Sequence, residues 1–272
     1  MILTITQEKI LQSLAEYKFL TITQFIKLGV STQKTNLSNS LKPLVHTRRP
    51  IVGRMDFGVH PRTGRYEYMY YLKNRGKKLL IDNRIYEENI KLPKGSGILF
   101  SSDYYHRKFT IDYHIQCMIE SKINAVDVSG FHRYFDKVGS QRKGGTLKAK
   151  TYINYTGGYI IADSSVLLTK KENSRLYAIE VYNDKNTKRI LEQLQKHRIG
   201  IKQSALCENY DVKKGHRVLC VFTHDGIMES VMERFDAGSD SDMFLFKTYE
   251  QIMNSFLLGW SDLDSITYNL IE

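Results

Sequence analysis

Residues 159–184 read YIIADSSVLLTKKENSRLYAIEVYND and hold two apolar runs, each with one acid set into it. The acids are Asp163 in the first run and Glu180 in the second. Apolar runs of this length on either side of a short polar segment are typical of neighbouring buried strands. A buried carboxylate is costly without compensation, so we expect a metal ion, a hydrogen-bond donor or an opposite charge beside each acid. The identity of that partner decides whether the pair is catalytic.

The sequence around this stretch alternates between helical and strand patterns. Helices are predicted at 110–121, 185–206, 224–235 and at the end of 243–257; strands are predicted at 125–135, 157–169, 174–184, 216–223 and at the start of 243–257. Strands separated by helices predict an α/β (or α+β) domain with a mixed sheet covered on its faces.

The N-terminal part predicts three short helices followed by a hairpin. The helices are expected at 6–17 with Thr6 as N-cap, at 21–30 with Thr21 as cap and Gly29 as stop, and at 31–45 opening on Ser31. Pro43 should end or kink the third helix. Two alternating runs around the turn HPRTGR (60–65) predict the hairpin, and residues 73–88 a closing helix.

Three helices followed by a basic hairpin are the order of a winged helix-turn-helix, in which the third helix enters the major groove and the wing contacts the backbone. Amide side chains on the third helix can pair with adenine edges, and cations can reach guanine or phosphate. The predicted DNA-contacting residues are Gln33, Lys34, Asn36, Asn39, Lys42, Arg48, Arg49, Arg54, Arg62 and Arg65. A solvated polar helix face and a protein-binding winged helix are the alternatives.

The net charge of +11 is unevenly placed along the 272 residues. Residues 1–95 hold 17 Lys and Arg against 7 Asp and Glu, a net +10, whereas residues 96–272 hold 23 against 22, a net +1. A basic half joined to a neutral half indicates a nucleic-acid-binding module that carries a second domain. We therefore expect a DNA-binding domain over 1–92, a linker over 93–104 and an α/β domain over 105–272.

Other features of composition favour a cytoplasmic protein without a membrane partner. Three scattered cysteines without a CxxC pair argue against a disulfide framework or a zinc site, and fit a reducing compartment. No apolar run has the length of a membrane span, and the first residues do not resemble a signal peptide. P-loop, GxGxxG, GxSxG and HExxH motifs are all missing. Residues 139–150, GSQRKGGTLKAK, form a basic loop that a partner would have to order.

An Asp on one strand and a Glu on the next, with a helix before and a helix after, resembles the PD-(D/E)XK nuclease core. Adjacent strands bring facing side chains within about 5 Å, so both acids could hold one divalent cation, Mg²⁺ or Mn²⁺. Such an ion makes a bound water nucleophilic and neutralises phosphate. The resemblance implies a restriction-endonuclease-like domain with Asp163 and Glu180 as metal ligands.

The chain as a whole resembles the replication-relaxation family and MobC-type plasmid relaxases. The resemblance is carried by ILQSLAEYKFLTITQF (10–25), YIIADSSVLL (159–168) and RLYAIEVYNDKNTKRILEQLQKH (175–197), with DYHIQCMIES (112–121) as the helix before the strands. It implies Glu120 as an accessory acid and places His114 near the site. The alternatives are a solvated Glu120 and a structural His114.

Two positions depart from the family pattern. Ala162 replaces a proline, and Tyr182 stands where such a nuclease has the lysine that stabilises developing charge. Lys188, Gln193 and Lys196 on the following helix are candidate substitutes; without one, the domain would be catalytically silent. Tyr182 could instead attack a phosphodiester as relaxase tyrosines do, or simply pack in the core.

Two functions follow from these observations. The first is a metal-dependent endonuclease that nicks one strand at an origin of plasmid or conjugative mobilisation, with duplex DNA, single-stranded DNA and relaxosome proteins as partners. The second is a non-catalytic DNA-binding protein: a replication initiator, a relaxosome accessory protein or a transcriptional regulator.

Overall fold

The structure is a computed structural model that describes residues 2–62, 64–86, 90–93, 101–139, 146–210, 212 and 215–271. The chain divides into two compact units, unit 1 (Met1–Ile111) and unit 2 (Asp112–Glu272). The boundary falls inside the long helix α5 (Ser101–Ile123). Residues 101–104 of the predicted linker are therefore helical, and residues 94–100 lie outside the described part of the chain.

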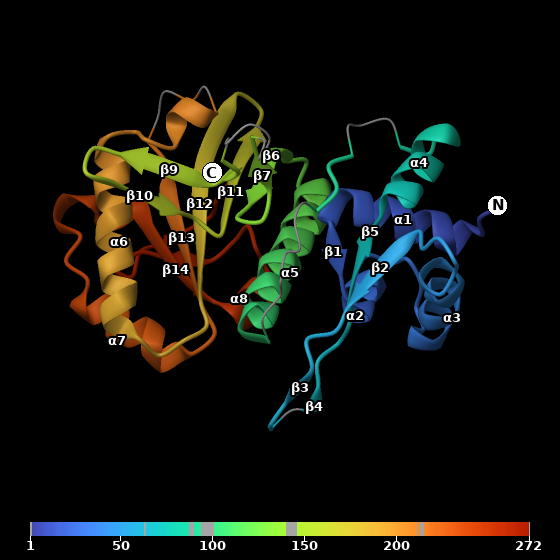
Figure 1. Ribbon diagram of the computed structural model, residues 1–272. Helices are drawn as coiled ribbons and strands as arrows, with labels where there is room; N and C mark the ends of the chain where they lie inside the picture. Colours follow the sequence, from blue (N-terminus) through green and yellow to red (C-terminus); the bar gives the residue numbers. More distant parts are fainter. Residues whose placement is uncertain are drawn as a thin grey trace. The chain divides into compact units, whose positions relative to one another are not determined.

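Unit 1 has the predicted order of three helices and a hairpin (Figure 1). Its elements are α1 (Ile5–Tyr17), β1 (Phe19–Leu20), α2 (Ile22–Lys27), α3 (Lys34–Val45), β2 (Val52–Met55), β3 (Val59–His60), β4 (Gly64–Arg65), β5 (Met69–Leu72) and α4 (Asn74–Asp82). Strands β1, β5 and β2 form an antiparallel sheet, and β3 and β4 pair beyond it as the tip of the hairpin.

Local signals at the helix ends of unit 1 are partly as expected. Thr21 caps α2 and Gly29 follows its end with φ +70°, as predicted. The cap of α1 is Thr4 rather than Thr6, because the capping box pairs Thr4 with Gln7. Helix α3 begins at Lys34, three residues after Ser31, and continues through Pro43 to Val45. Each of these corrections moves a boundary by two or three residues.

Unit 2 is built around a seven-stranded mixed sheet in the order β16-β15-β14-β13-β12-β11-β6. Its strands are β6 (Asp127–Arg133), β11 (Ser164–Lys170), β12 (Asn173–Tyr182), β13 (Arg217–Phe222), β14 (Phe244–Thr248), β15 (Trp260–Ser261) and β16 (Thr267–Tyr268). Strands β12, β13 and β14 are parallel, and their neighbours on both sides are antiparallel. The α/β class predicted from the sequence is confirmed.

In the described part of unit 2, two small hairpins and three further helices accompany this sheet. They are β7 (Lys137–Val138), β8 (Lys148–Ala149), β9 (Tyr152–Tyr155), β10 (Gly158–Ile161), α6 (Thr187–Lys202), α7 (Asp225–Arg234) and α8 (Tyr249–Asn254), with 3-10 helices at Cys207–Asn209 and Gly238–Met243. Strand β7 pairs with β8, and β9 with β10. The strand predicted over 157–169 is therefore two strands, β10 and β11, with Asp163 in the break between them.

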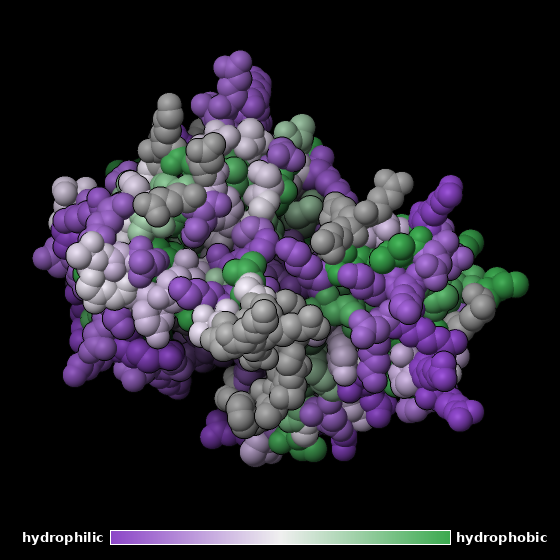
Figure 2. Space-filling view, turned by 45° about the horizontal axis from the view of Figure 1, so that its top comes forward, coloured by the Kyte–Doolittle hydropathy of each residue, from purple (hydrophilic) through white to green (hydrophobic). Residues whose placement is uncertain are grey.

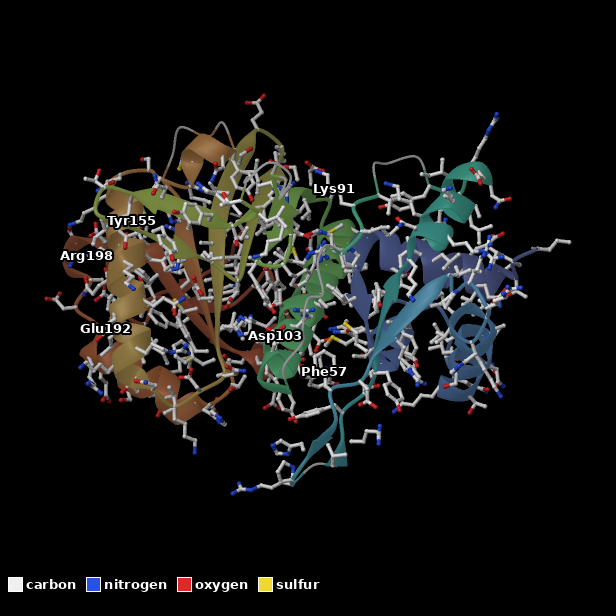
Figure 3. The ribbon with its side chains drawn as sticks, viewed as in Figure 1. Phe57, Lys91, Asp103, Tyr155, Glu192 and Arg198 are labelled. Atoms are coloured by element: carbon white, nitrogen blue, oxygen red, sulfur yellow. The ribbon has the colours of Figure 1, made fainter. Side chains whose placement is uncertain are left out.

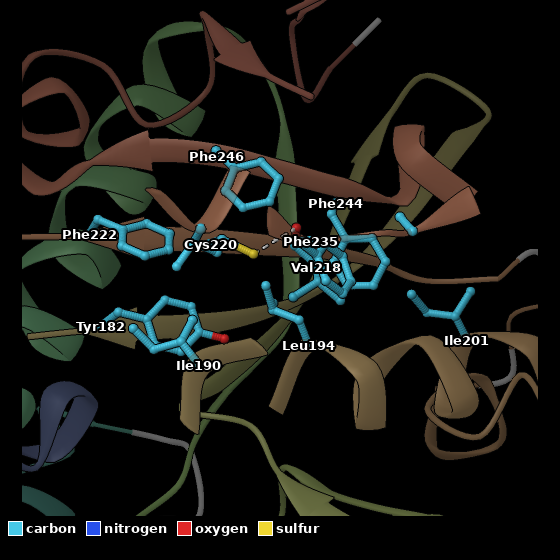
Figure 4. Close-up of a cluster of buried hydrophobic side chains, with 12 residues drawn as sticks. Tyr182, Ile190, Leu194, Ile201, Val218, Cys220, Phe222, Phe235, Phe244 and Phe246 are labelled. Atoms are coloured by element: carbon cyan, nitrogen blue, oxygen red, sulfur yellow. Dashed lines mark hydrogen bonds between the residues drawn. The ribbon is translucent and has the colours of Figure 1, made fainter. Parts of the chain in front are cut away.

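Apolar side chains of α6, α7, β13 and β14 form one large core cluster (Figure 4). It contains Ile190 and Leu194 of α6, Cys220 and Phe222 of β13, and Tyr182 of β12. Helix α5 covers the opposite face, because its Tyr113 hydroxyl lies 2.8 Å from Ser164 Oγ, one residue along β11 from Asp163. The sheet is therefore packed between helices, and Asp163 and Glu180 belong to the α6 side.

None of the helices within the described residues combines the length and the apolar character that a membrane crossing requires. On the face drawn in Figure 2, hydrophobic residues form separate patches between hydrophilic ones.

Candidate functional sites

The first candidate site is the polar surface of unit 1 formed by α3, the segment after it and the hairpin. Leu37, Leu41 and Leu44 are spaced by three or four residues along α3, so they share its buried side and the polar residues face outward. All ten predicted DNA-contacting residues are exposed: Gln33, Lys34, Asn36, Asn39, Lys42, Arg48, Arg49, Arg54, Arg62 and Arg65. The sequence prediction of an exposed polar surface on these elements is confirmed; what it binds stays a prediction.

Two of the hairpin arginines are held in fixed positions. Arg65 Nη1 lies 2.7 Å from Asp56 Oδ2 and also donates to the Tyr68 hydroxyl at 3.2 Å. The guanidinium of Arg54 lies 4.2 Å from the centre of the Tyr68 ring. Arg65 therefore carries a partly neutralised charge, whereas Arg62 stands at the turn of the hairpin.

An aromatic group fixes the base of the hairpin within unit 1. The ring of Tyr104, near the start of α5, lies 4.5 Å from the Tyr66 ring and 5.0 Å from the Phe57 ring, between centroids. Phe57 is labelled at this point in Figure 3. Because ring pairs of this kind add to the apolar burial, the base of the hairpin is stabilised while its tip projects beyond β2 and β5 (Figure 1).

The second candidate site is the pair Asp163 and Glu180 in unit 2. Ser164 lies opposite Ile179 in the antiparallel β11–β12 register, so Asp163 falls opposite Glu180 on the same face. The two carboxyl groups share a hydrogen bond. Both side chains are buried, with 8% of Asp163 and 1% of Glu180 exposed. The prediction that the two acids meet across neighbouring strands is confirmed.

Protein donors occupy most of the carboxylate oxygens of this pair. Glu180 Oε2 accepts from Gln193 Nε2 at 2.7 Å, and Glu180 Oε1 lies 2.6 Å from His197 Nε2. Asp163 Oδ2 accepts from the backbone N–H of Val181 at 2.7 Å. Gln193 and His197 reach Glu180 together because residues four apart lie on the same side of α6.

Burial shifts the pKa values of Glu180 and His197. Burial, and then the neighbouring Asp163, raise the pKa of Glu180 well above its usual value. Burial, and then His216, lower the pKa of His197 to about 3. Burial therefore disfavours the charged form of both groups and favours a hydrogen bond between neutral Glu180 and His197 over an ion pair.

The pair is a poor match for a divalent cation. Within the described ranges, no three or more His, Cys, Asp and Glu side chains are grouped so that they could hold a metal ion. Three oxygens of the Asp163–Glu180 pair already accept from protein donors or lie against His197. A cation bound here would have to replace those contacts, so the pair in this arrangement does not fit a metal centre.

Buried polar atoms without a partner gather around this pair. Within the described part of unit 2 they are Thr151 Oγ1, Tyr182 OH, His197 Nδ1 and both ring nitrogens of His216. Thr151 is close to the pair in the chain fold, because its carbonyl accepts from the N–H of Ala162. Unpaired buried polar atoms are costly, and ordered water is the common way in which they are satisfied.

Tyr182 lies two residues beyond Glu180 on the same face and packs into the apolar cluster. Its ring centre is 4.9 Å from that of Phe222, and Figure 4 shows it beside Ile190. Burial is the main cause that raises the pKa of its hydroxyl well above the usual value. A hydroxyl so placed is hard to ionise, which disfavours the nucleophile predicted from the sequence.

Of the three candidate substitutes for the missing lysine, Gln193 does reach the pair, because it donates to Glu180. The other predicted catalytic residues are not brought to it. Lys188 and Lys196 lie on the exposed side of α6. Glu120 is on α5, where its carboxylate accepts from the backbone N–H groups of Phe256 and Leu257.

His114 is also on α5, and its ring stacks on Phe131 with 3.7 Å between centroids. Both Glu120 and His114 belong to the helix that covers the opposite face of the sheet. They therefore hold α5 to its neighbours rather than extending the carboxylate pair.

Sequence reasoning did not single out His197 and His216. For His197 a signal was available, because the apolar positions Ile190, Leu194 and Ile201 define the buried side of α6 and His197 falls on it. His216 precedes β13 and carries no comparable pattern.

Comparison with known proteins returned no family model, no curated protein and no solved structure that matches this chain.

Proposed function

We propose that the chain binds double-stranded DNA through unit 1, with α3 in the major groove and the β3–β4 hairpin against the backbone. The observation that carries the proposal is the common exposure of the ten polar residues on α3, the following segment and the hairpin. The elements of unit 1 follow the order of a winged helix-turn-helix, with three helices before the hairpin. Seven of these ten are Lys or Arg and none is acidic.

The roles of these residues divide by chemistry. Asn36 and Asn39 have side chains that can pair with the exposed edge of adenine. Lys34, Lys42 and Arg62 supply positive charge for contacts with phosphates. Such contacts determine the affinity and the register of the protein on the duplex, not its sequence specificity. Arg65 is paired with Asp56, so its contribution to binding is smaller than that of Arg62.

The test is a fluorescence anisotropy titration of the whole chain with a 30-base-pair duplex of mixed sequence. The double substitution Lys34→Ala/Lys42→Ala should weaken binding by about tenfold or more and lower the slope against salt by about two. Lys122→Ala, which removes an exposed cation from α5 in unit 2, is the matched control and should bind like the unmodified chain. Equal binding by the double variant and the control contradicts the proposal.

Strand cleavage by unit 2 is the second candidate function, because Asp163 and Glu180 lie on one face and share a hydrogen bond. A helix precedes the two antiparallel strands and a helix and a parallel strand follow them, which is the order that the PD-(D/E)XK resemblance implies. The occupied oxygens of Glu180 weigh against a metal there. Between the two, DNA binding without cleavage is the function that the geometry supports best.

The two candidates differ in a single assay. Supercoiled plasmid carrying the sequence that unit 1 selects from randomised duplexes is incubated with the chain and Mg²⁺ or Mn²⁺. Binding without cleavage predicts that the plasmid stays supercoiled. Nicked circles that disappear with Asp163→Asn would favour cleavage. If cleavage is found, an origin of plasmid or mobile-element transfer is the expected target; otherwise an initiator, relaxosome accessory or regulatory role remains.

A further inference from the structure

The segment 137–161 of unit 2 is basic and aromatic, and apart from the buried Thr151 it plays no part in the candidate carboxylate site. It contains five cations, Lys137, Arg142, Lys143, Lys148 and Lys150, three tyrosines, and no Asp or Glu. Lys137, Lys148 and Lys150 are in the described residues; the other two cations are outside them. Since residues 96–272 have a net charge of only +1, this segment is a local concentration of positive charge.

The β9–β10 hairpin has one apolar and one exposed face. Ile153 and Ile160 lie opposite each other in its register and pack on Leu176 and Ala178 of β12. The alternate residues therefore face outward. Tyr159 is 57% exposed and Ile161 is 40% exposed. In Figure 3, Tyr155 marks the position of this hairpin beside α6.

Two tyrosines and a lysine form a stack on the outward face. The rings of Tyr152 and Tyr159 lie 5.0 Å apart between centroids, with 23° between their planes. Lys148 Nζ lies 5.1 Å from the centre of the Tyr152 ring. Lys148 comes from β8, the strand just before β9, and it is exposed. Proteins build sites for unpaired nucleotides from exposed aromatic rings, on which bases stack, and from cations that contact the phosphates.

We propose that this face, defined as Lys148, Tyr152, Tyr159 and Ile161, binds single-stranded nucleic acid. An unpaired base continues the stack on the Tyr159 ring, and Lys148 contacts a phosphate of the same strand. A duplex would not use the stack, because its bases are already stacked on one another. The charge of the segment favours a polyanion over an apolar protein surface. The site goes beyond duplex binding by unit 1 and does not depend on it.

The test measures the affinity of the whole chain for a fluorescein-labelled dT12 oligonucleotide by anisotropy. Tyr159→Ala should weaken binding about tenfold and Tyr159→Phe should change it less than about twofold, because phenylalanine keeps the stacking face. Lys148→Glu should also weaken binding and lower its dependence on salt. Circular dichroism melting confirms that each variant is folded.

Two controls establish whether dT12 binding depends on this face in particular. Tyr268→Ala removes another tyrosine that has a cation over its ring, because Arg217 lies 4.9 Å from the centre of the Tyr268 ring. Unlike Tyr159, this tyrosine has acids nearby: Asp242 accepts a hydrogen bond from Arg217, and Asp262 accepts one from the Tyr268 hydroxyl. Tyr268→Ala should leave dT12 binding unchanged. Lys34→Ala/Lys42→Ala should weaken duplex binding and leave dT12 binding intact, so the two proposals fail separately.

Three outcomes would overturn the proposal. They are absence of dT12 binding by the unmodified chain, unchanged binding by Tyr159→Ala, and equal losses in Tyr159→Ala and Tyr268→Ala. In the first case the face fits a protein partner instead.

Discussion

His197 Nε2 lies 2.6 Å from Glu180 Oε1, and both side chains are almost completely buried. Gln193 holds the second oxygen of the same carboxyl group, and Asp163 shares a hydrogen bond with it. The sheet thus carries a group of hydrogen-bonded polar side chains inside its core, although His197 Nδ1 has no partner in the described structure. These contacts give Glu180 a structural role, whether or not it also has a catalytic one.

Substitutions of Glu180 should separate these roles. Glu180→Ala leaves Gln193 and His197 without their partner and should lower the free energy of unfolding by about 3 kcal/mol. Glu180→Gln keeps the shape and the neutral hydrogen bonding and should cost less than about 1 kcal/mol. Urea unfolding of the two variants gives the comparison. Equal losses would show that the carboxyl group is held as an anion, contrary to the raised pKa of Glu180.

Stability should fall as the pH is lowered, because buried histidines resist protonation. Histidine in an unfolded chain titrates near pH 6.5. Burial lowers the pKa of His197 to about 3 and that of His216 to about 4 in the folded chain. The unfolded chain then binds more protons, so stability present above pH 6.5 is lost as the pH falls from 6.5 to about 4 for His216 and to about 3 for His197. Two such groups predict a slope of up to about 2.7 kcal/mol per pH unit.

The contribution of these two histidines is measured as a difference between variants. Urea unfolding at pH 7, 6 and 5 is compared for the unmodified chain and His197→Gln/His216→Phe. The double variant should show the shallower decline. Glu180 changes the stability in the opposite direction with pH. Its pKa is raised in the folded chain, so the stability that it contributes is lost as the pH rises. Both proteins in the comparison contain Glu180. Identical slopes would mean that these histidines titrate normally in the folded chain.

Tyr182 tests the nucleophile hypothesis directly. Its hydroxyl is buried and has no partner within the described structure. Removing an unsatisfied buried hydroxyl without changing shape should leave the melting temperature unchanged or raise it by a few degrees. Tyr182→Phe should therefore be at least as stable as the unmodified chain in a thermal scan. A marked loss of stability would indicate a hydroxyl partner, such as ordered water, that the substitution removes.

Glu120 should matter for stability alone. It accepts from the N–H groups of Phe256 and Leu257 and from the hydroxyl of Ser255 at 3.0 Å. Glu120→Ala leaves these donors unsatisfied and should lower the free energy of unfolding by about 2–4 kcal/mol. Duplex binding at a temperature where the variant is folded should match that of the unmodified chain. Weaker binding by the folded variant would assign Glu120 a role beyond packing.

The parts of the fold that the sequence predicted are those set by local pattern. The apolar runs at 157–169 and 174–184, with the short polar segment between them, predict an antiparallel pair, and its register brings Asp163 opposite Glu180. The apolar positions of α3 likewise turn Asn36 and Asn39 outward. Boundaries such as Thr4 rather than Thr6 depend on which of two similar residues completes a capping box, and the pattern fits both.

Gln193 was named from the sequence as a candidate near the carboxyl pair, but the two histidines beside it were not, because their positions depend on packing between elements. His216 is buried near His197 because β13, which it precedes, pairs with β12. Glu120 and His114 were expected near the pair because their helix precedes the strands, but that helix covers the other face. The face on which a helix packs is a property of the whole sheet rather than of the helical sequence.

Contact between α3, the hairpin tip and duplex DNA is tested most directly by DNA cleavage from tethered iron chelates. The three native cysteines are buried, so a single added cysteine can be labelled selectively. Asn39→Cys and Arg62→Cys carry the chelate at α3 and at the hairpin turn, and Lys122→Cys is the control on unit 2. We expect discrete cleavage of the bound duplex from Asn39→Cys and Arg62→Cys, with at most weak, unlocalised cleavage from the control. Cleavage from Lys122→Cys alone, or from none of the three while the duplex is bound, would contradict it.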